Sequence, residues 1–250
     1  MRGVTQLHDI VYIVCAGFST ILRFNATTHQ RLTDIHVDGL NSPWDIVACD
    51  ETSQVYVIDL QRRGWRMSAD GADIKQWLSE PSWIFNPGSL SVTSTRLLVT
   101  SGASKQLTQF DAVGVILRQV QLPDYMPPFH AVESPAGTFI VSHYSPQLVQ
   151  YQVSEVDTDG KVLRQFSGSR MSPISYTRHV TVDSHGSIFV ADAHNRRILL
   201  LDAQLTLRRV VVEEHELNYR RPLCLWYLER TGQLLVGSFD RVAVFGVLRR

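Results

Sequence analysis

The feature that most constrains the fold is a short apolar segment that recurs six times along the chain. Residues 55–58 (VYVI) and 188–191 (IFVA) are typical of it, because β-branched and aromatic residues dominate both. The six segments begin at Val11, Val55, Leu97, Phe139, Ile188 and Leu234, at intervals of 42 to 49 residues. Such residues favour strands, and a fixed period of this length indicates a repeated supersecondary unit. The sequence therefore predicts a repeat protein built from strands.

Each repeat predicts a four-stranded sheet. In the clearest unit, residues 179–212, the strand-like segments HVTVD, SIFVAD, RILLLD and LRRVVV alternate with turns rich in Asp, Gly, Asn and Ser. One such sheet cannot bury both of its faces alone, so the units must stack against one another. We therefore expect a single all-β domain over residues 1–250, a six-bladed β-propeller of four-stranded blades. A large β-sandwich would give no reason for the fixed period.

The last repeat is shorter than the others. Its third strand is expected over residues 241–247, and only three residues follow. Either the last blade has three strands, or residues that once preceded Met1 supply a fourth. The second alternative would make the chain a domain of a longer protein, or one that has lost N-terminal modules.

Composition excludes several classes of protein. Hydrophobic residues make up 44% of the chain, and 24 basic residues balance 24 acidic ones, so a packed core is expected and binding of polyanions by bulk charge is not. Cys15, Cys49 and Cys224 are too few and too widely spaced for a disulfide framework, which favours a cytoplasmic protein. No apolar stretch approaches the ~18 residues that span a bilayer, so membrane insertion is not expected.

One unit carries a recognisable motif. Residues 179–202 combine an apolar strand ending in Asp, the strand IFVAD, and an Asn-Arg pair before another apolar strand. This pattern resembles the NHL repeat, and residues 55–59 and 139–142, with the later turns SADG and DTDG, keep parts of it. The other units depart from the motif: where it has Asp after the second strand, they have Cys15, Ser101 and Ser238.

The resemblance implies a six-bladed propeller and two classes of partner. NHL-type propellers form the C-terminal domain of ubiquitin ligases of the tripartite-motif kind, where they bind protein substrates or single-stranded RNA. This chain has no Cys- and His-rich zinc module, so it is not expected to be a complete ligase. We expect a non-catalytic binding module for a protein, or alternatively for single-stranded RNA, and not for duplex DNA. Other six-bladed families, such as the sugar-lactonase-like propellers, share the period, so a metal-dependent lyase or lactonase-like enzyme is the alternative.

The expected partner site lies on the face that carries the second-to-third-strand loops and the connections between blades, here called the top face. Arginine makes bidentate contacts with carboxylates and phosphates, and arginines gather on this face over blades five and six. The predicted site contains Arg62, Arg63, His130, Tyr144, Arg178, His179, His194, Arg196, Arg197, Arg221 and Arg241. Neighbouring acidic residues leave an alternative, a mutually paired surface, and the arginine after Asn195 could instead link blades structurally.

Two histidines occupy equivalent places in their repeats. His130 and His179 each stand nine residues before a second-strand core, which predicts that both face the channel mouth. An amidating lyase of the same repeat type holds zinc with channel histidines, and zinc catalysis needs about three converging ligands. The third ligand would have to be Asp45, Cys224 or a loop histidine. With only two histidines at equivalent positions, we expect no catalytic residue, no metal and no other cofactor.

Overall fold

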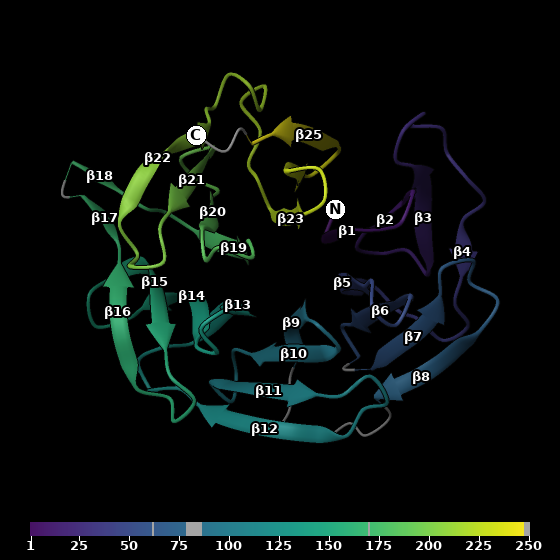
Figure 1. The fold of residues 1–250 in the computed structure, drawn as a ribbon, viewed down its shortest axis with the longest axis horizontal. Helices are drawn as coiled ribbons and strands as arrows, with labels where there is room; N and C mark the ends of the chain where they lie inside the picture. The colour runs from purple at the N-terminus through teal and green to yellow at the C-terminus, as the bar shows by residue number, and fades with distance from the viewer. Residues whose placement is uncertain (62, 79–86, 170, 248–250) are drawn as a thin grey trace.

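The computed structural model describes residues 1–61, 63–78, 87–169 and 171–247. Within them, six antiparallel sheets surround a central axis, like the blades of a propeller (Figure 1). Five sheets have four strands, and the last, formed by residues 224–246, has three. The described residues include no helix, and hence none of the length and hydrophobicity that a bilayer crossing requires. The predicted all-β, six-bladed architecture is therefore confirmed, with a three-stranded last blade.

The strands follow the order of the chain. Blade one contains β1 (Gly3–Leu7), β2 (Ile10–Val14), β3 (Thr20–Asn25) and β4 (Ile35–His36). Blade two contains β5 (Pro43–Cys49), β6 (Gln54–Asp59), β7 (Gly64–Ser68) and β8 (Ile74–Leu78). Blade three contains β9 (Pro87–Thr93), β10 (Arg96–Ser101), β11 (Gln106–Phe110) and β12 (Ile116–Gln121).

The second half of the chain repeats this layout. Blade four contains β13 (Pro128–Glu133), β14 (Phe139–Ser145), β15 (Gln150–Val156) and β16 (Val162–Phe166). A small hairpin follows, β17 (Gly168–Ser169) with β18 (Ser172–Pro173). Blade five contains β19 (Thr177–Val182), β20 (Ile188–Asp192), β21 (Arg197–Leu201) and β22 (Leu207–Val212), and blade six contains β23 (Cys224–Leu228), β24 (Gln233–Gly237) and β25 (Val242–Gly246).

The first strands of the blades form a closed ring around the channel. Each of β1, β5, β9, β13, β19 and β23 contacts the first strand of the next blade, and β23 contacts β1 (Figure 1). The blades stack through their apolar faces, as the sequence pattern requires. Between blades two and three, for example, Trp77 contacts Tyr56 and Phe110 edge-on, with ring centroids 5.4 and 5.3 Å away. This stacking holds the inner ends of the first strands in fixed positions.

Candidate metal centre at the channel mouth

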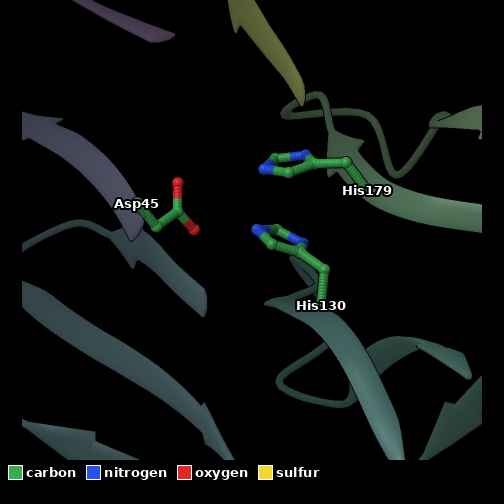
Figure 2. A group of neighbouring side chains, drawn as sticks. All are labelled: Asp45, His130 and His179. Atoms are coloured by element: carbon green, nitrogen blue, oxygen red, sulfur yellow. The ribbon is translucent and has the colours of Figure 1, made fainter. Parts of the chain in front are cut away.

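Three side chains from three different blades converge in the channel. Asp45 comes from β5, His130 from β13 and His179 from β19. One ligand atom of each residue lies within 4.8 Å of the ligand atoms of the other two. Figure 2 shows the two imidazole rings stacked, with one nitrogen of each ring directed toward the Asp45 carboxylate.

Irregularities in the first strands place these residues. The pairing of β5 with β6 shifts between Pro43 and Asp45, and that of β13 with β14 shifts between Pro128 and His130. The pairing of β19 with β20 shifts between Thr177 and Val180, which brackets His179. A bulge of this kind bends the strand and changes the direction of a side chain. The same local distortion in three blades therefore contributes to the convergence of the three side chains.

The two histidines form a stacked pair in which His130 is buried and His179 is half-buried. Their ring centroids are 3.6 Å apart, with an angle of 29° between the ring planes. Burial lowers the pKa of His130 to about 4, and burial together with the neighbouring His130 ring lowers the pKa of His179 well below its usual value. Both rings are neutral at neutral pH, which is the form that binds metals. Nε2 of His130 lies 3.1 Å from the Leu90 carbonyl oxygen.

Asp45 is a buried carboxylate whose hydrogen bonds come from the backbone. Its Oδ1 accepts a hydrogen bond from the Ile46 amide at 2.9 Å, and its Oδ2 accepts one from the Leu90 amide at 2.8 Å. Among the described residues, no side-chain cation lies within the 4.0 Å of an ion pair with it. Burial raises the pKa of Asp45 to about 7. Since an unpaired buried charge is costly, a cation bound beside this carboxylate would stabilise its ionised form.

The cluster lies between two cavities of the channel. A cavity of about 490 Å³ opens toward the top face, and Asp45, His130 and His179 line its inner end. A second cavity, of about 330 Å³, lies on the opposite side and is lined by His130 and His179 as well. Two imidazole nitrogens and one carboxylate oxygen suit zinc and related divalent ions, and catalytic zinc sites keep a further position open for water or substrate. Here that open position would face the top cavity.

The structure also places the other residues that the sequence offered as a third ligand. Cys224 is buried in β23 outside the cluster, and burial raises the pKa of its thiol to about 12. His143, one of the two histidines next to the second-to-third-strand loops, lies within β14 and is buried, with Nε2 2.8 Å from the Ser154 hydroxyl. His194 lies in the turn after β20, where it stacks on Tyr176 with a centroid distance of 4.9 Å. Asp45 therefore completes the group.

The predicted partner residues divide into three sets. Around the channel, Arg178 joins His130 and His179 in lining the top cavity. Tyr144, in β14, packs against Tyr151 at a centroid distance of 5.1 Å, close to the aromatic cluster that includes His194. Among the remaining residues, Arg62 lies outside the described residues, and the other arginines do not line the top cavity.

Two of these arginines have structural partners. Arg63 pairs with the buried Asp59 at 2.9 Å, and Arg197 pairs with the buried Asp192 at 2.7 Å, so both guanidiniums neutralise a carboxylate of their own blade. Arg196, the arginine after Asn195, lies near Glu214 at 3.8 Å. Arg221 and Arg241 are exposed. The structural ion pair of blade five is therefore made by Arg197, within its own blade, and not by the Arg196 that was expected to link two blades. Arg221 and Arg241 are the exposed members of the predicted site on blade six.

Two aromatic residues from the first strands form part of the wall of the top cavity. Trp44 lines this cavity, and its indole nitrogen donates a hydrogen bond to the Gly88 carbonyl oxygen at 2.5 Å. Phe129 occupies the equivalent place in blade four. The two positions share a sequence pattern, because Pro43-Trp44-Asp45 and Pro128-Phe129-His130 have the same order of proline, aromatic residue and candidate ligand.

Comparison with known proteins supports the fold. No protein-family model matches the sequence, and no curated protein does. Among solved structures, Kuenenia stuttgartiensis hydrazine synthase is similar with a TM-score of 0.72 and 12% identity, over 98% of this chain and 83% of that chain. A catalytically inactive virginiamycin B lyase from Staphylococcus aureus, solved with quinupristin, is similar with a TM-score of 0.71 and 12% identity, over 99% of this chain and 80% of that chain. The WD40 propeller domain of Doa1 is similar with a TM-score of 0.65 and 14% identity, over 97% of this chain and 90% of that chain. At such low sequence identity, these similarities show that the fold is shared and show nothing about function.

Proposed function

We propose that this propeller is a metal-dependent enzyme of the lyase or lactonase-like kind, acting at the top mouth of its channel. The observation that carries the proposal is the convergence of Asp45, His130 and His179 at the inner end of an open cavity. The sequence led us to expect no metal because only two ligands were assured. The third converging side chain removes that reason.

The donor set defines the chemistry. One carboxylate and two neutral imidazoles around a divalent ion leave a net positive charge at the site. An ion with an open position polarises a carbonyl group or lowers the pKa of a bound water, and both effects promote the cleavage of esters and lactones. Among the structural neighbours, the lyase from Staphylococcus aureus is an example of an enzyme with this fold.

Metal binding is the first test. The purified chain is stripped with a chelator, dialysed and titrated with Zn²⁺ by calorimetry, and Co²⁺ is added separately to record its visible absorption. We expect one ion per chain, and a Co²⁺ spectrum of low coordination number. Asp45→Asn should abolish binding. His194→Ala is the matched control, since His194 lies on the top face outside the cluster and should leave binding unchanged.

Two results would overturn the metal centre. One is a native chain that binds no more Zn²⁺ than the folded Asp45→Asn variant. The other is equal loss of binding in His194→Ala, which would place the ion elsewhere. The enzymatic part is then tested with the zinc-loaded protein on a panel of lactones and esters. If the Asp45→Asn variant still turns over a substrate, the activity does not depend on this site.

The exposed rim of blade six supports a second candidate function, the binding of a protein partner. Arg220 donates two hydrogen bonds of 2.7 Å to Asp240, which joins the connection before blade six to the loop between β24 and β25. Beside this ion pair, Tyr219 is 61% exposed and Phe239 is 83% exposed. Arg221 and Arg241 follow them in the sequence and are exposed too. Exposed aromatic residues together with arginine are typical of interaction hot spots.

The test of this second function is a paired charge reversal, Arg221→Glu with Arg241→Glu, in pull-downs with cross-linking. Reversal of Arg197 is unsuitable because this residue neutralises Asp192. We expect the captured protein partner to be lost while the melting temperature stays unchanged. If RNA is captured instead, its affinity should fall with salt at a slope of about −0.7 per phosphate neutralised. Capture that survives the reversal would contradict a site on this rim. The NHL resemblance of blade five favours such a partner, and it stays a prediction.

A further inference from the structure

Two arginines gather at the channel mouth around a single aromatic ring. The guanidinium carbon of Arg2 lies 4.1 Å from the centroid of the Trp44 ring, and that of Arg178 lies 5.2 Å from the same ring. Both arginines are half-buried and line the top cavity with Trp44. Residues from blades one, two and five thus place two positive charges on the wall of one cavity.

Neither guanidinium has a carboxylate at ion-pair distance, since none in the part of the chain that the structure describes lies within 4.0 Å of it. Besides the Trp44 ring, Arg178 contacts the Tyr176 hydroxyl at 3.4 Å, and its charge acts at longer range on Asp45, whose pKa it lowers. Burial and the charge of Arg178 both lower the pKa of Arg2, so the two cations repel each other. Arg63 and Arg197, in contrast, each pair with a buried Asp. An anion placed between Arg2 and Arg178 would relieve this repulsion and would use both guanidiniums as donors.

The rest of the cavity wall is largely apolar. Phe129 and Tyr176 lie on one side, with ring centroids 6.1 Å apart, and Leu60 and Leu223 contribute further apolar surface. The volume of about 490 Å³ is within the range of small-molecule sites. The inner end of the same cavity is formed by Asp45 and the two histidines. The cavity therefore combines two arginines, a largely apolar wall and the candidate metal centre.

We propose that the cavity binds a small organic anion, with its carboxylate or phosphate group between Arg2 and Arg178 and its apolar body against Phe129 and Tyr176. The bond to be cleaved then lies toward Asp45, His130 and His179. The position of the reacting end rests on the proposed metal-dependent function. The binding of the acid group does not, because it depends on the two arginines alone.

The experiment measures the binding of benzoate and phenyl phosphate, with neutral benzyl alcohol for comparison, to the full chain by calorimetry and Trp fluorescence. It is carried out on the metal-free and on the zinc-loaded protein. Both anions should bind, benzyl alcohol should bind at least tenfold more weakly, and the stronger of the two anions identifies the acid group. Charge-assisted hydrogen bonds are worth about 1.5–3 kcal/mol, so Arg178→Gln should weaken anion binding by about tenfold or more.

Control variants separate this proposal from the metal centre. Arg196→Gln removes a partly exposed arginine that does not line the cavity and should leave anion binding unchanged. Arg2→Gln should act as Arg178→Gln does, and it serves if Arg178→Gln does not fold. Neither variant should change the zinc stoichiometry. Zinc binding without anion binding in the native chain would overturn the anion site alone, and so would equal anion affinities in the native chain and both variants. Anion binding without zinc binding would overturn the metal centre alone.

Discussion

Two regions of the propeller bury an aspartate in different ways. On the top face, Asp59 and Asp192 end the second strands of blades two and five and are 1% and 0% exposed. In the channel, Asp45 is 4% exposed. The residue type and burial are nearly the same in all three, so any difference in role must come from their partners.

The top-face aspartates are fully satisfied within the chain. Asp192 accepts a hydrogen bond from Nε of Arg197 at 2.7 Å, one to each of its oxygens from the Asn195 amide group, and one from the Ser175 amide at 2.8 Å. Asp59 accepts hydrogen bonds from the Arg63 side chain and from the backbone amides of Asn41, Gln61 and Arg63. Each carboxylate thereby joins the loop before its blade to the turn after its second strand.

The channel aspartate lacks such compensation. Asp45 accepts two backbone hydrogen bonds but has no side-chain cation at ion-pair distance among the described residues. The comparison shows that a buried carboxylate with its own arginine stabilises the fold, whereas one without a cation is available to bind something else. The three predictions below test this difference, beginning with the largest effect.

Loss of a top-face carboxylate should have the largest effect on stability. Asp192→Ala leaves Arg197 half-buried without its partner and removes the hydrogen bonds that hold the Asn195 turn. Breaking a buried ion pair costs about 3–5 kcal/mol, so the free energy of unfolding should fall by about that amount. Urea unfolding of the native and variant chains measures it. A loss below about 1 kcal/mol would show that the pair contributes little.

Zinc should stabilise the native chain but not the channel variant. At free Zn²⁺ of about one hundred times the dissociation constant, binding to the folded state adds about 2.7 kcal/mol, which is roughly 5–10 °C in Tm for a chain of this length. Asp45→Asn should remove this shift. Without metal, the free energy of unfolding of the variant should lie within about 1 kcal/mol of that of the native chain, because only hydrogen bonds to backbone amides change. Thermal scans with and without Zn²⁺ measure both effects, and an equal shift in the two chains would contradict the assignment.

Two adjacent arginines give the smallest predicted effect and the sharpest internal control. Arg196 is partly exposed near Glu214, and exposed pairs of this kind are worth about 0–1 kcal/mol. Arg196→Gln should therefore change the free energy of unfolding by less than about 0.5 kcal/mol. Arg197→Gln should cost several times more, because it leaves the buried Asp192 without its cation. If the two variants lose the same free energy of unfolding, the two positions do not differ in their structural role.

The blade count followed from the sequence, whereas the candidate site followed only in part. Six strand cores with a regular spacing define six sheets, because alternating apolar residues determine which face of a strand is buried. The channel positions are harder to count, because the shifts in pairing near Asp45, His130 and His179 break the regular spacing between first and second strands. Two histidines could still be aligned by their distance from the next strand.

Neighbouring residues of one type were the hardest to separate. Arg196 and Arg197 are equivalent by composition, but the backbone at Arg196 has a φ of +53°, which turns the chain so that the next arginine reaches Asp192. Likewise, Arg2 and Arg178 are 176 residues apart in the sequence and meet only because the ring of first strands closes. Contacts across blades depend on this closure, which no local pattern records.

The most direct test of the metal centre is a crystal structure of the chain grown with Zn²⁺, with anomalous diffraction measured on both sides of the zinc absorption edge. The account predicts one strong peak in the channel, with zinc about 2.0–2.2 Å from a carboxylate oxygen of Asp45 and from one nitrogen each of His130 and His179. It also predicts that this peak is missing in Asp45→Asn crystals grown in the same way. A native channel without a peak, or a peak held only by surface histidines, would contradict it.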